Sequence, residues 1–544
     1  MNVVVLKFSL AFNQPLLLSL VKELGIKNLY FIGSETGCPD KEELAQLGCN
    51  LFQFSEPDLF NALFKDVDWN AMPPIDRPLL ESMSPWESEI LRLFERDYQI
   101  VNEDDRGWHD EEYHNTKLLM RAQNYSSFYN HVEYSGEEKR RKYYRYLRFW
   151  NHFLNENKID LTLSAFYPHF PYEYILYRMC KLRGIRTVLT SHTPIPGKWL
   201  VYDDIEKSAE DLKNLPRISD NADELFNSLS QNAKDEIKRI EEGTQPYYMV
   251  KGYLNNLLAN DNTDKIIKDN ERVRKLRPNT ASTRKRKSIF NTVDFALILD
   301  KIHFRLRHKS RKHIGALLQG FYESKCEKNP DLNKNFVYLA LHYQPEASNS
   351  PVGGYYANQI LMAEMIAQHL PDGWFLYLKE HPAQQYINRN IDFYNDLAKN
   401  PRIKMISKSF DTFKLAQNCR AVSTIAGTVA WESLFTGKPV LLFGASPIMY
   451  APAVFRIKTN DDMANAMKAI EGGVKPEKLD VFNYVKQLDN RTVLAVNDYI
   501  QKIQFGYTDQ EYVERMTKYY VDYIRNEASH TKLNSVPHTQ ENNN

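Results

Sequence analysis

The chain opens with a short apolar run, a stretch of helical spacing and a second apolar run. Residues 3–8 and 29–32 are mostly apolar, and residues 14–24 repeat apolar side chains at helical spacing. This order predicts a strand, a helix and a second strand. The same order returns at 160–166, 172–183 and 187–191. The first half of the chain therefore predicts a domain built on a parallel sheet.

The pattern is denser after residue 336. The runs FVYLALHY, WFLYLK, RAVST and PVLLFG predict strands, and helical spacing separates them at 357–369, 412–417 and 428–435. Four strand and helix repeats follow one another in a span of about 110 residues. They predict a doubly wound parallel sheet, which binds ligands beyond the carboxyl ends of its strands.

These two patterns predict an α/β protein with two Rossmann-like parallel-sheet domains that face a cleft, together with helical insertions. The chain has 544 residues, which is too long for one ordinary hydrophobic core. The expected parts are an N-terminal domain over 1–206 with a helical insertion at about 58–155, a basic helical linker over 207–330, a C-terminal domain over 331–480, helices over 481–527 that pack back toward the N-terminal domain, and a disordered tail over 528–544.

Composition narrows the classes of protein that fit. Apolar residues make up 43% and charged residues 26%, which is ordinary globular usage, and the net charge of +1 selects no polyanionic partner. Five cysteines without CxxC spacing fit a reduced compartment, so we expect a cytoplasmic protein. Lys7 and Asn13 interrupt the first apolar run, which therefore predicts a strand and not a signal peptide. No apolar run approaches the roughly 20 residues of a membrane span.

The first candidate site is a His-Pro turn. The strand LYLK runs into Glu380, His381 and Pro382, so an imidazole lies at the carboxyl end of a parallel strand. Pro382 fixes the turn. His381 can donate to a phosphate oxygen and stabilise a departing nucleotide, with Lys379 and Glu380 beside it. The structural alternative is a histidine that bonds only to a loop carbonyl.

The second candidate site is a helix N-terminus. A strand ends at Ser423-Thr424, a Gly427-Thr428 turn follows, and a helix begins at once. The hydroxyl groups, the free amides and the helix dipole together suit a phosphate. Glu432, one turn into this helix, can reach a ribose hydroxyl or simply favour the helix dipole. A third loop, after the strand at 336, carries the polar residues Gln344, Glu346, Ser348 and Asn349 before a Gly353-Gly354 turn.

KEHP followed by STIAGTVAWESLFTGKPVLLFG resembles the second domain of capsule polysaccharide biosynthesis proteins, the bacterial Kdo-transferase-like and sialyltransferase-like GT-B glycosyltransferases. The resemblance covers residues 336–445 well and the first half only loosely. It implies that His381-Pro382 and Ser423-Thr424 hold the CMP of a CMP-activated 2-keto acid sugar. It also implies a GT-B architecture, in which the first domain holds the acceptor.

The first domain supplies the remaining candidates. His169 and Glu173 follow the strand at 160–166, and either can act as general base on an acceptor hydroxyl or as nucleophile. Alternatively, Glu173 caps the helix and His169 packs among aromatic rings. His192, Asp203 and Asp204 are second-choice acceptor-side residues.

No metal or other cofactor is expected. The acidic segment EDDRGWHDEEYH at 103–114 has no standard ligand spacing, so a charged exposed loop is the simpler interpretation. The basic segment 272–313 lacks a nucleic-acid-binding module. A solvated helical face is the default there, and peripheral attraction to the inner membrane is the alternative.

The function expected from these residues is transfer of Kdo or another nonulosonic acid from a CMP-sugar to a hydroxyl of a bacterial surface polysaccharide, lipopolysaccharide or other glycolipid. The partners are therefore a nucleotide sugar and a glycan or lipid-linked glycan acceptor. Three alternatives stay open: a CDP-polyol phosphotransferase of the teichoic-acid type, a UDP-sugar epimerase of GT-B-like fold, and a non-catalytic capsule-assembly scaffold.

Overall fold

The computed structural model describes residues 1–8, 13–33, 37–54, 146–147, 149–151, 153–168, 171–244, 313–343, 349, 351–381, 384, 389, 391–495 and 508–527. The expected insertion after residue 57, the basic segment up to residue 312 and the tail from 528 therefore lie outside, or almost wholly outside, the described residues.

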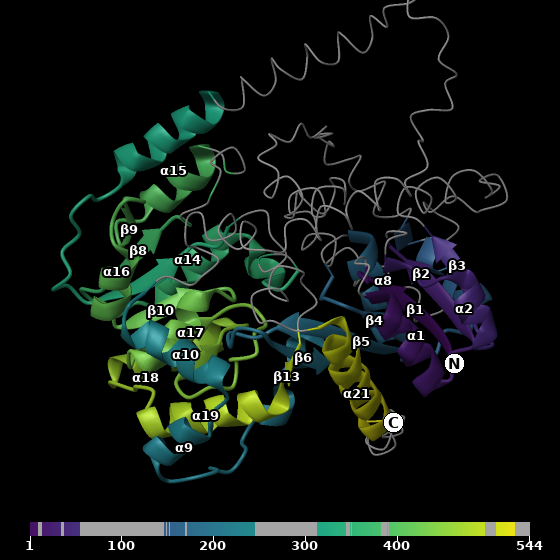
Figure 1. Ribbon diagram of the computed structural model, residues 1–544. Helices are drawn as coiled ribbons and strands as arrows, with labels where there is room; N and C mark the ends of the chain where they lie inside the picture. Colours follow the sequence, from purple (N-terminus) through teal and green to yellow (C-terminus); the bar gives the residue numbers. More distant parts are fainter. Residues whose placement is uncertain are drawn as a thin grey trace, which may run out of the picture.

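The first sheet has seven strands in the order β13-β6-β5-β4-β1-β2-β3 (Figure 1). Strands β1 to β5 are parallel, while β6 runs antiparallel to β5 and β13 antiparallel to β6. Their bounds are β1 Asn2–Leu6, β2 Asn28–Ile32, β3 Asn50–Phe54, β4 Leu161–Ser164, β5 Arg186–His192, β6 Lys198–Tyr202 and β13 Val493–Leu494.

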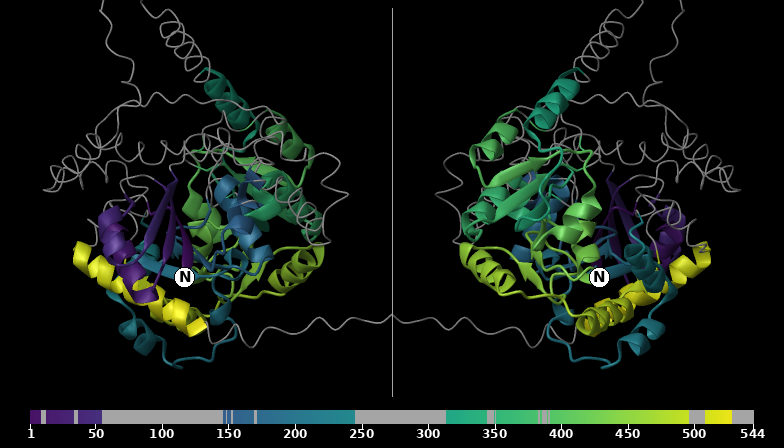
Figure 2. Two further views of the ribbon diagram at one scale, coloured as in Figure 1. Left: turned by 90° about the vertical axis from the view of Figure 1, so that its right-hand side faces the viewer. Right: turned by 90° about the vertical axis from the view of Figure 1, so that its left-hand side faces the viewer.

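Alternate residues of β1 face different hydrophobic clusters, because successive side chains of a strand point to opposite faces. Val3 and Val5 pack with helix α1 (Asn13–Leu24) and helix α21 (Asp509–Glu527). Val4 and Leu6 pack with helix α8 (Pro171–Leu182) and with helical residues between 146 and 156. The short helix α2 spans Lys41–Gln46. Helices thus cover both faces of the first sheet, and α21 closes one face from the far end of the chain (Figure 2).

The second sheet has six strands, all parallel, in the order β12-β11-β10-β7-β8-β9. The strands are β7 Phe336–Ala340, β8 Phe375–Lys379, β9 Ile403–Ile406, β10 Ala421–Thr424, β11 Val440–Leu442 and β12 Val454–Arg456. The helices are α14 Gln359–His369, α15 Ile391–Lys399, α16 Thr412–Asn418, α17 Thr428–Phe435, α18 Asn460–Glu471 and α19 Lys478–Arg491.

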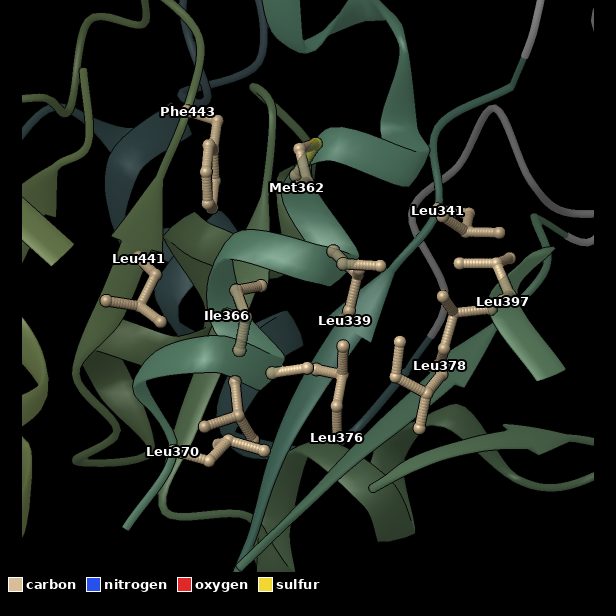
Figure 3. Close-up of a cluster of buried hydrophobic side chains, with 14 of the residues drawn as sticks. Leu339, Leu341, Met362, Ile366, Leu370, Leu376, Leu378, Leu397, Leu441 and Phe443 are labelled. Carbon is tan, nitrogen blue, oxygen red and sulfur yellow. The ribbon is translucent and has the colours of Figure 1, made fainter. Parts of the chain in front are cut away.

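The core of the second domain lies mainly between this sheet and α14. Leu339, Leu376 and Leu378 point from β7 and β8 toward Ile366 of α14 (Figure 3). All four side chains are fully buried. The other face of the same strands carries Tyr338 and Tyr377, which pack with α16. Two adjacent parallel strands buried on both faces are what a doubly wound sheet requires.

The described part of the expected linker consists mainly of helices. Helix α9 (Ala222–Ser228) and helix α10 (Gln231–Glu241) pack on α17 and α19, and residues 313–325 are also helical. The 3-10 turns at Ile205–Lys207, Glu210–Leu212 and Gly354–Ala357 complete the described helical elements.

The α/β fold with two parallel-sheet domains is confirmed. Helix α17 has the bounds that the sequence predicts, and β7, β8, β10 and β11 lie where apolar runs predict strands. Apolar patterning did not predict β6 or β13, the two strands that add to the first sheet in antiparallel sense. No helix among the described residues combines the length and the apolar character that crossing a bilayer needs.

We predict that α21 is essential to the stability of the first domain. Tyr520 of α21 is 1% exposed and packs in the cluster with Phe8, at 6.4 Å between ring centroids. Tyr520→Ala should lower the free energy of unfolding by about 3–5 kcal/mol, the usual effect of removing a buried aromatic ring. The measurement is the urea unfolding midpoint of the full chain. Lys518→Ala, an exposed position on the same helix, is the matched control.

Candidate functional site

Three loops meet at one edge of the second sheet. Strand β7 pairs with β10 on one side and with β8 on the other, and all three are parallel. Their carboxyl ends therefore share an edge, which is where such sheets bind ligands. His342 follows β7, His381 follows β8, and α17 follows β10.

His342 joins the loop after β7 to the loop after β10. Its Nε2 lies 2.9 Å from Thr424 Oγ1 and accepts the Ala426 backbone N–H at 3.1 Å. Since Nε2 accepts, the proton of the neutral ring belongs on Nδ1, and the Thr424 hydroxyl donates to Nε2. The Gly427 N–H in turn donates to Thr424 Oγ1 at 3.3 Å. One imidazole thus orients the turn that precedes α17.

The electrostatics of His342 agree with this neutral role. Burial is the main cause that lowers the pKa of the imidazole to about 3, and electrostatic interaction with His381 and Arg389 contributes to the same shift. The backbone of His342 is also held, because its N–H donates to Gln359 Oε1 at 2.8 Å. The ring is therefore a fixed hydrogen-bond acceptor at neutral pH.

The turn before α17 is closely packed against the β7 loop. A Cβ at Gly427 would lie 2.8 Å from Thr424 Oγ1 and 3.2 Å from His342 Nε2, so the loops approach too closely for a side chain there. Among the described residues, no side chain caps α17, which begins at Thr428. An uncapped helix N-terminus presents backbone N–H groups and a positive dipole end, both of which favour a phosphate.

His381 follows β8, the strand next to β7, and so lies one strand away from His342. Its ring centroid is 5.8 Å from that of Tyr343, and its backbone N–H donates to Glu380 Oε1 at 2.9 Å. Burial lowers the pKa of His381 to about 4, and the charges of Lys408, Arg389 and Lys379 act in the same direction. The imidazole of the ligand-free protein is therefore neutral at pH 7 and carries one N–H donor.

Lys379 is a buried cation at the end of β8. It is 4% exposed, and its Nζ donates to Thr412 Oγ1 at 2.7 Å. Burial is the main cause that lowers its pKa to about 8. An ammonium that is bonded to a neutral hydroxyl adds positive potential near His381.

Two of the predicted donor residues point to the other face of the sheet. Ser423 lies on the same face of the strand as Ala421 and Ile425, which belong to the cluster under α14. Its Oγ is buried without a hydrogen-bond partner among the described residues. Glu380 is 1% exposed and forms an ion pair with Arg389 at 2.8 Å. Thr424, by contrast, faces His342.

Glu432 of α17 contacts the helical linker. Its carboxylate lies 3.0 Å from Arg239 of α10, and Arg239 also pairs with Glu236 at 2.8 Å. Burial raises the pKa of Glu432, although Arg239 opposes this effect. The structure thus places the predicted ribose ligand in an ion pair with a residue outside the second sheet.

In the first domain, Glu173 and His192 lie at the carboxyl edge of the sheet. Glu173, in the first turn of α8, is 2% exposed and lies 3.2 Å from Lys7 Nζ. Lys7 follows β1 with a φ of 64°, a conformation unusual for a residue with a side chain. His192 ends β5 and stacks on Phe166 at 5.5 Å between ring centroids.

The structure does not bring Asp203 and Asp204 to this edge. They follow β6, which runs antiparallel to β5, so they lie beside the start of β5. Asp203 pairs with Arg186 at 3.1 Å, and Asp204 pairs with Lys181 at 3.2 Å. The reversal of one strand therefore separates these carboxylates from His192.

Loops from the two sheets meet. Val352 and Ala445 of the second domain are buried in the hydrophobic cluster built around α8, and Ala426 packs against it. Ala426 follows β10 and α8 follows β4, so both lie at carboxyl ends of strands. The loop after β10, which His342 contacts, therefore lies against the first domain.

Some predicted residues lie outside the described part of the chain. They are His169, Gln344, Glu346, Ser348, Pro382 and the acidic segment 103–114. Among the residues that the structure does describe, no group of three or more His, Cys, Asp or Glu side chains forms a candidate metal site.

Sequence reasoning missed His342. The signal was present, because His342 follows the apolar run of β7 just as His381 follows β8. The polar residues predicted from the sequence lie further along that loop. His342 differs from them because it contacts the β10 loop directly.

Comparison with known families supports the resemblance. The family model described as capsule polysaccharide biosynthesis protein matches residues 349–453. This segment includes His381, Thr424 and α17, so the resemblance indicated by the motifs is confirmed there. No curated protein sequence matches the chain significantly.

Solved structures give weak likenesses. The Thermosulfurimonas dismutans KpsC beta Kdo 2,7 transferase is 9% identical, with 68% of this chain and 86% of that chain covered and a TM-score of 0.26. The UDP-GlcNAc 2-epimerase from Methanocaldococcus jannaschii is 14% identical, with 65% and 82% covered and a TM-score of 0.21. At such TM-scores neither likeness carries an argument, so the fold rests on the strand pairing described above.

We predict an acid-sensitive second domain. The folded pKa of His342 is about 3, whereas an unfolded histidine has a pKa of about 6.5. Between these values the unfolded chain binds a proton that the native protein does not. The contribution of His342 to the free energy of unfolding should therefore not change with pH above pH 6.5. Below pH 6.5 it should fall as the pH drops, by up to about 1.4 kcal/mol per pH unit.

The measurement is the urea unfolding free energy between pH 7 and pH 4 for the wild type and for His342→Gln. The glutamine amide can still accept from Ala426 but does not titrate. Its pH slope should be smaller than that of the wild type. Equal slopes would show that His342 is not the buried neutral group described above.

Proposed function

We propose that the protein is a glycosyltransferase that moves Kdo or another nonulosonic acid from a CMP-activated donor to a hydroxyl of a bacterial surface polysaccharide or glycolipid. The observation that carries this proposal is the junction of His342, Thr424 and the uncapped start of α17, with His381 one strand away. This junction lies largely within the segment that matches the capsule polysaccharide biosynthesis family.

In this proposal the donor phosphate binds at the start of α17. The first amides of the helix and the hydroxyl of Thr428 would surround it, Thr424 would hold the turn through its bond to His342, and the neutral imidazole of His381 would donate one N–H to a phosphate oxygen. As the bond to the sugar breaks, negative charge grows on the nucleotide. Fixed donors and the nearby charge of Lys379 would stabilise that charge more than the ground state.

The first domain would supply the acceptor side. We propose His169 or Glu173 as the group that removes the proton from the acceptor hydroxyl, and His192 as an acceptor contact. Glu173 is suited to this because it lies in the first turn of α8, the helix against which the second-domain loops pack. Asp203 and Asp204 are not included, since they lie at the opposite edge of the sheet.

Neither a metal nor another cofactor has a role in this proposal. Backbone amides, the helix dipole and cationic side chains would supply the positive potential that a metal gives to other transferases. The nucleotide sugar would be met in the cytoplasm, and a lipid-linked acceptor would place the protein at the cytoplasmic face of the inner membrane.

We predict that CMP stabilises the protein more than CDP, UDP or GDP does. A ligand that binds only the native state at about 100 times its Kd adds about 2.7 kcal/mol to stability. The measurement is the thermal unfolding midpoint of the full chain with each nucleotide. A larger shift with UDP or GDP would contradict the donor assignment.

We also predict that His381→Ala slows transfer about 100-fold, the usual effect of removing one fixed donor to a developing anion. The assay follows CMP release and product linkage with CMP-Kdo and a glycan acceptor. His369→Ala, at the end of α14, is the matched control. A phosphodiester product would indicate a polyol-phosphate transferase, and an isomerised UDP-sugar an epimerase. A protein that releases no nucleotide and is unaffected by His381→Ala would be a scaffold.

A further inference from the structure

The carboxylate of Glu380 is fully committed inside the second domain. Its Oε1 accepts the His381 N–H at 2.9 Å and Arg389 Nη2 at 3.3 Å. Its Oε2 accepts the Tyr394 hydroxyl at 2.9 Å and lies 2.8 Å from Arg389 Nε. The side chains of Glu380 and Arg389 are 0% and 1% exposed. A group with both oxygens so occupied has little capacity left for a sugar or a nucleotide.

Arg389 carries the connection to the neighbouring strand. Its Nη2 donates to the backbone carbonyl of His342 at 2.9 Å, as well as to Glu380. One guanidinium therefore connects His342, in the loop after β7, to Glu380, in the loop after β8. Among the described residues of these loops, the last backbone hydrogen bond between them runs from the Leu341 N–H to the Lys379 carbonyl at 3.0 Å, and beyond it side chains make the connection.

A tyrosine extends the connection to the third strand. The Tyr322 hydroxyl accepts the Glu380 N–H at 3.0 Å and donates to the Ile406 carbonyl at 2.6 Å. Tyr322 is fully buried. The side chains of Glu380, Arg389 and Tyr322 thus join the ends of β7, β8 and β9.

Stability alone does not explain this arrangement. Burying an ion pair costs several kcal/mol of desolvation for each charge, and an apolar replacement of similar volume is often neutral or stabilising. What the ion pair provides is geometry, because one nitrogen of Arg389, Nη2, donates to acceptors on two different loops. The predicted role of Glu380 as a donor-binding residue does not fit these contacts.

We infer that Glu380 and Arg389 are positioning residues, which lock the loops after β7 and β8 together and thereby hold His342 and His381 at the proposed donor site. Neither residue touches the donor. This inference rests on the proposed function for its effect on catalysis, but the locking of the loops can be tested without any substrate.

The test uses the full chain with Arg389→Met, Arg389→Lys and the double variant Glu380→Gln with Arg389→Met. The double variant removes both charges. The glutamine oxygen can accept the His381 N–H, and the Tyr394 hydroxyl can then accept from the glutamine NH2 group. Arg402→Met is the matched control, since Arg402 donates to the Leu370 and Pro371 carbonyls at the amino end of β9.

The first measurement is hydrogen exchange of the ligand-free protein. The double variant should lose protection at 341–343 and 424–427 while the strands of the second sheet keep theirs. Arg402→Met should leave both loops protected. Unchanged loops in the double variant, or uniform loss across the whole domain in every variant, would overturn the inference, because the pair would then be dispensable or merely structural.

The second measurement is kcat and KM for the donor. Misplacing a reacting group by about 1 Å can cost about 100-fold, so Arg389→Met and the double variant should lose about this factor in kcat. Arg389→Lys should recover part of the loss, since an ammonium can reach one of the two acceptors. A double variant with wild-type kcat would overturn the inference. If the wild type transfers no sugar but the loops lose protection as expected, the proposed function fails and the positioning role stands.

Discussion

The structure around the candidate site depends on one buried, neutral imidazole. His342 lies beyond the end of β7, the strand between β8 and β10, so it is adjacent to both loops that the motifs single out. Its Nε2 accepts hydrogen bonds from the loop after β10, and its carbonyl accepts one from Arg389. A charged ring could not accept at Nε2. Neutrality, which burial enforces, is therefore what keeps the turn before α17 in place.

The fold could be predicted because parallel strands buried on both faces leave an unambiguous signal. Apolar runs separated by helical spacing locate β7, β8, β10 and α17, and the carboxyl-end rule then places His381 and α17 at one edge. Apolar patterning did not predict β6, and it could not have given the direction of this strand, since the pattern is the same for a parallel and an antiparallel strand. Asp203 and Asp204 consequently lie at the edge opposite to His192.

Within the site, the limit of prediction was the face of each side chain. Adjacent residues at a strand end point in opposite directions, so Thr424 reaches His342 while Ser423 enters the core. The same alternation separates His381 from Glu380. A motif specifies residue types in order, and it does not say which of two neighbours faces the ligand. Partners distant in sequence, such as Arg239 for Glu432, leave no local signal at all.

The two buried systems on either side of the second sheet have different physical tasks. On the face of α17, polar atoms are arranged around a neutral ring and an open helix end, which leaves potential for an anion. On the face of α14, opposite charges cancel within the protein, and each oxygen of Glu380 already has partners. An ion pair whose charges cancel leaves little electrostatic potential for a ligand. It resists distortion, because separating the partners would leave an uncompensated buried ion. The Glu380–Arg389 pair, whose hydrogen bonds are made within the protein, can thus hold the hydrogen-bond donors at the start of α17 in place before a ligand arrives.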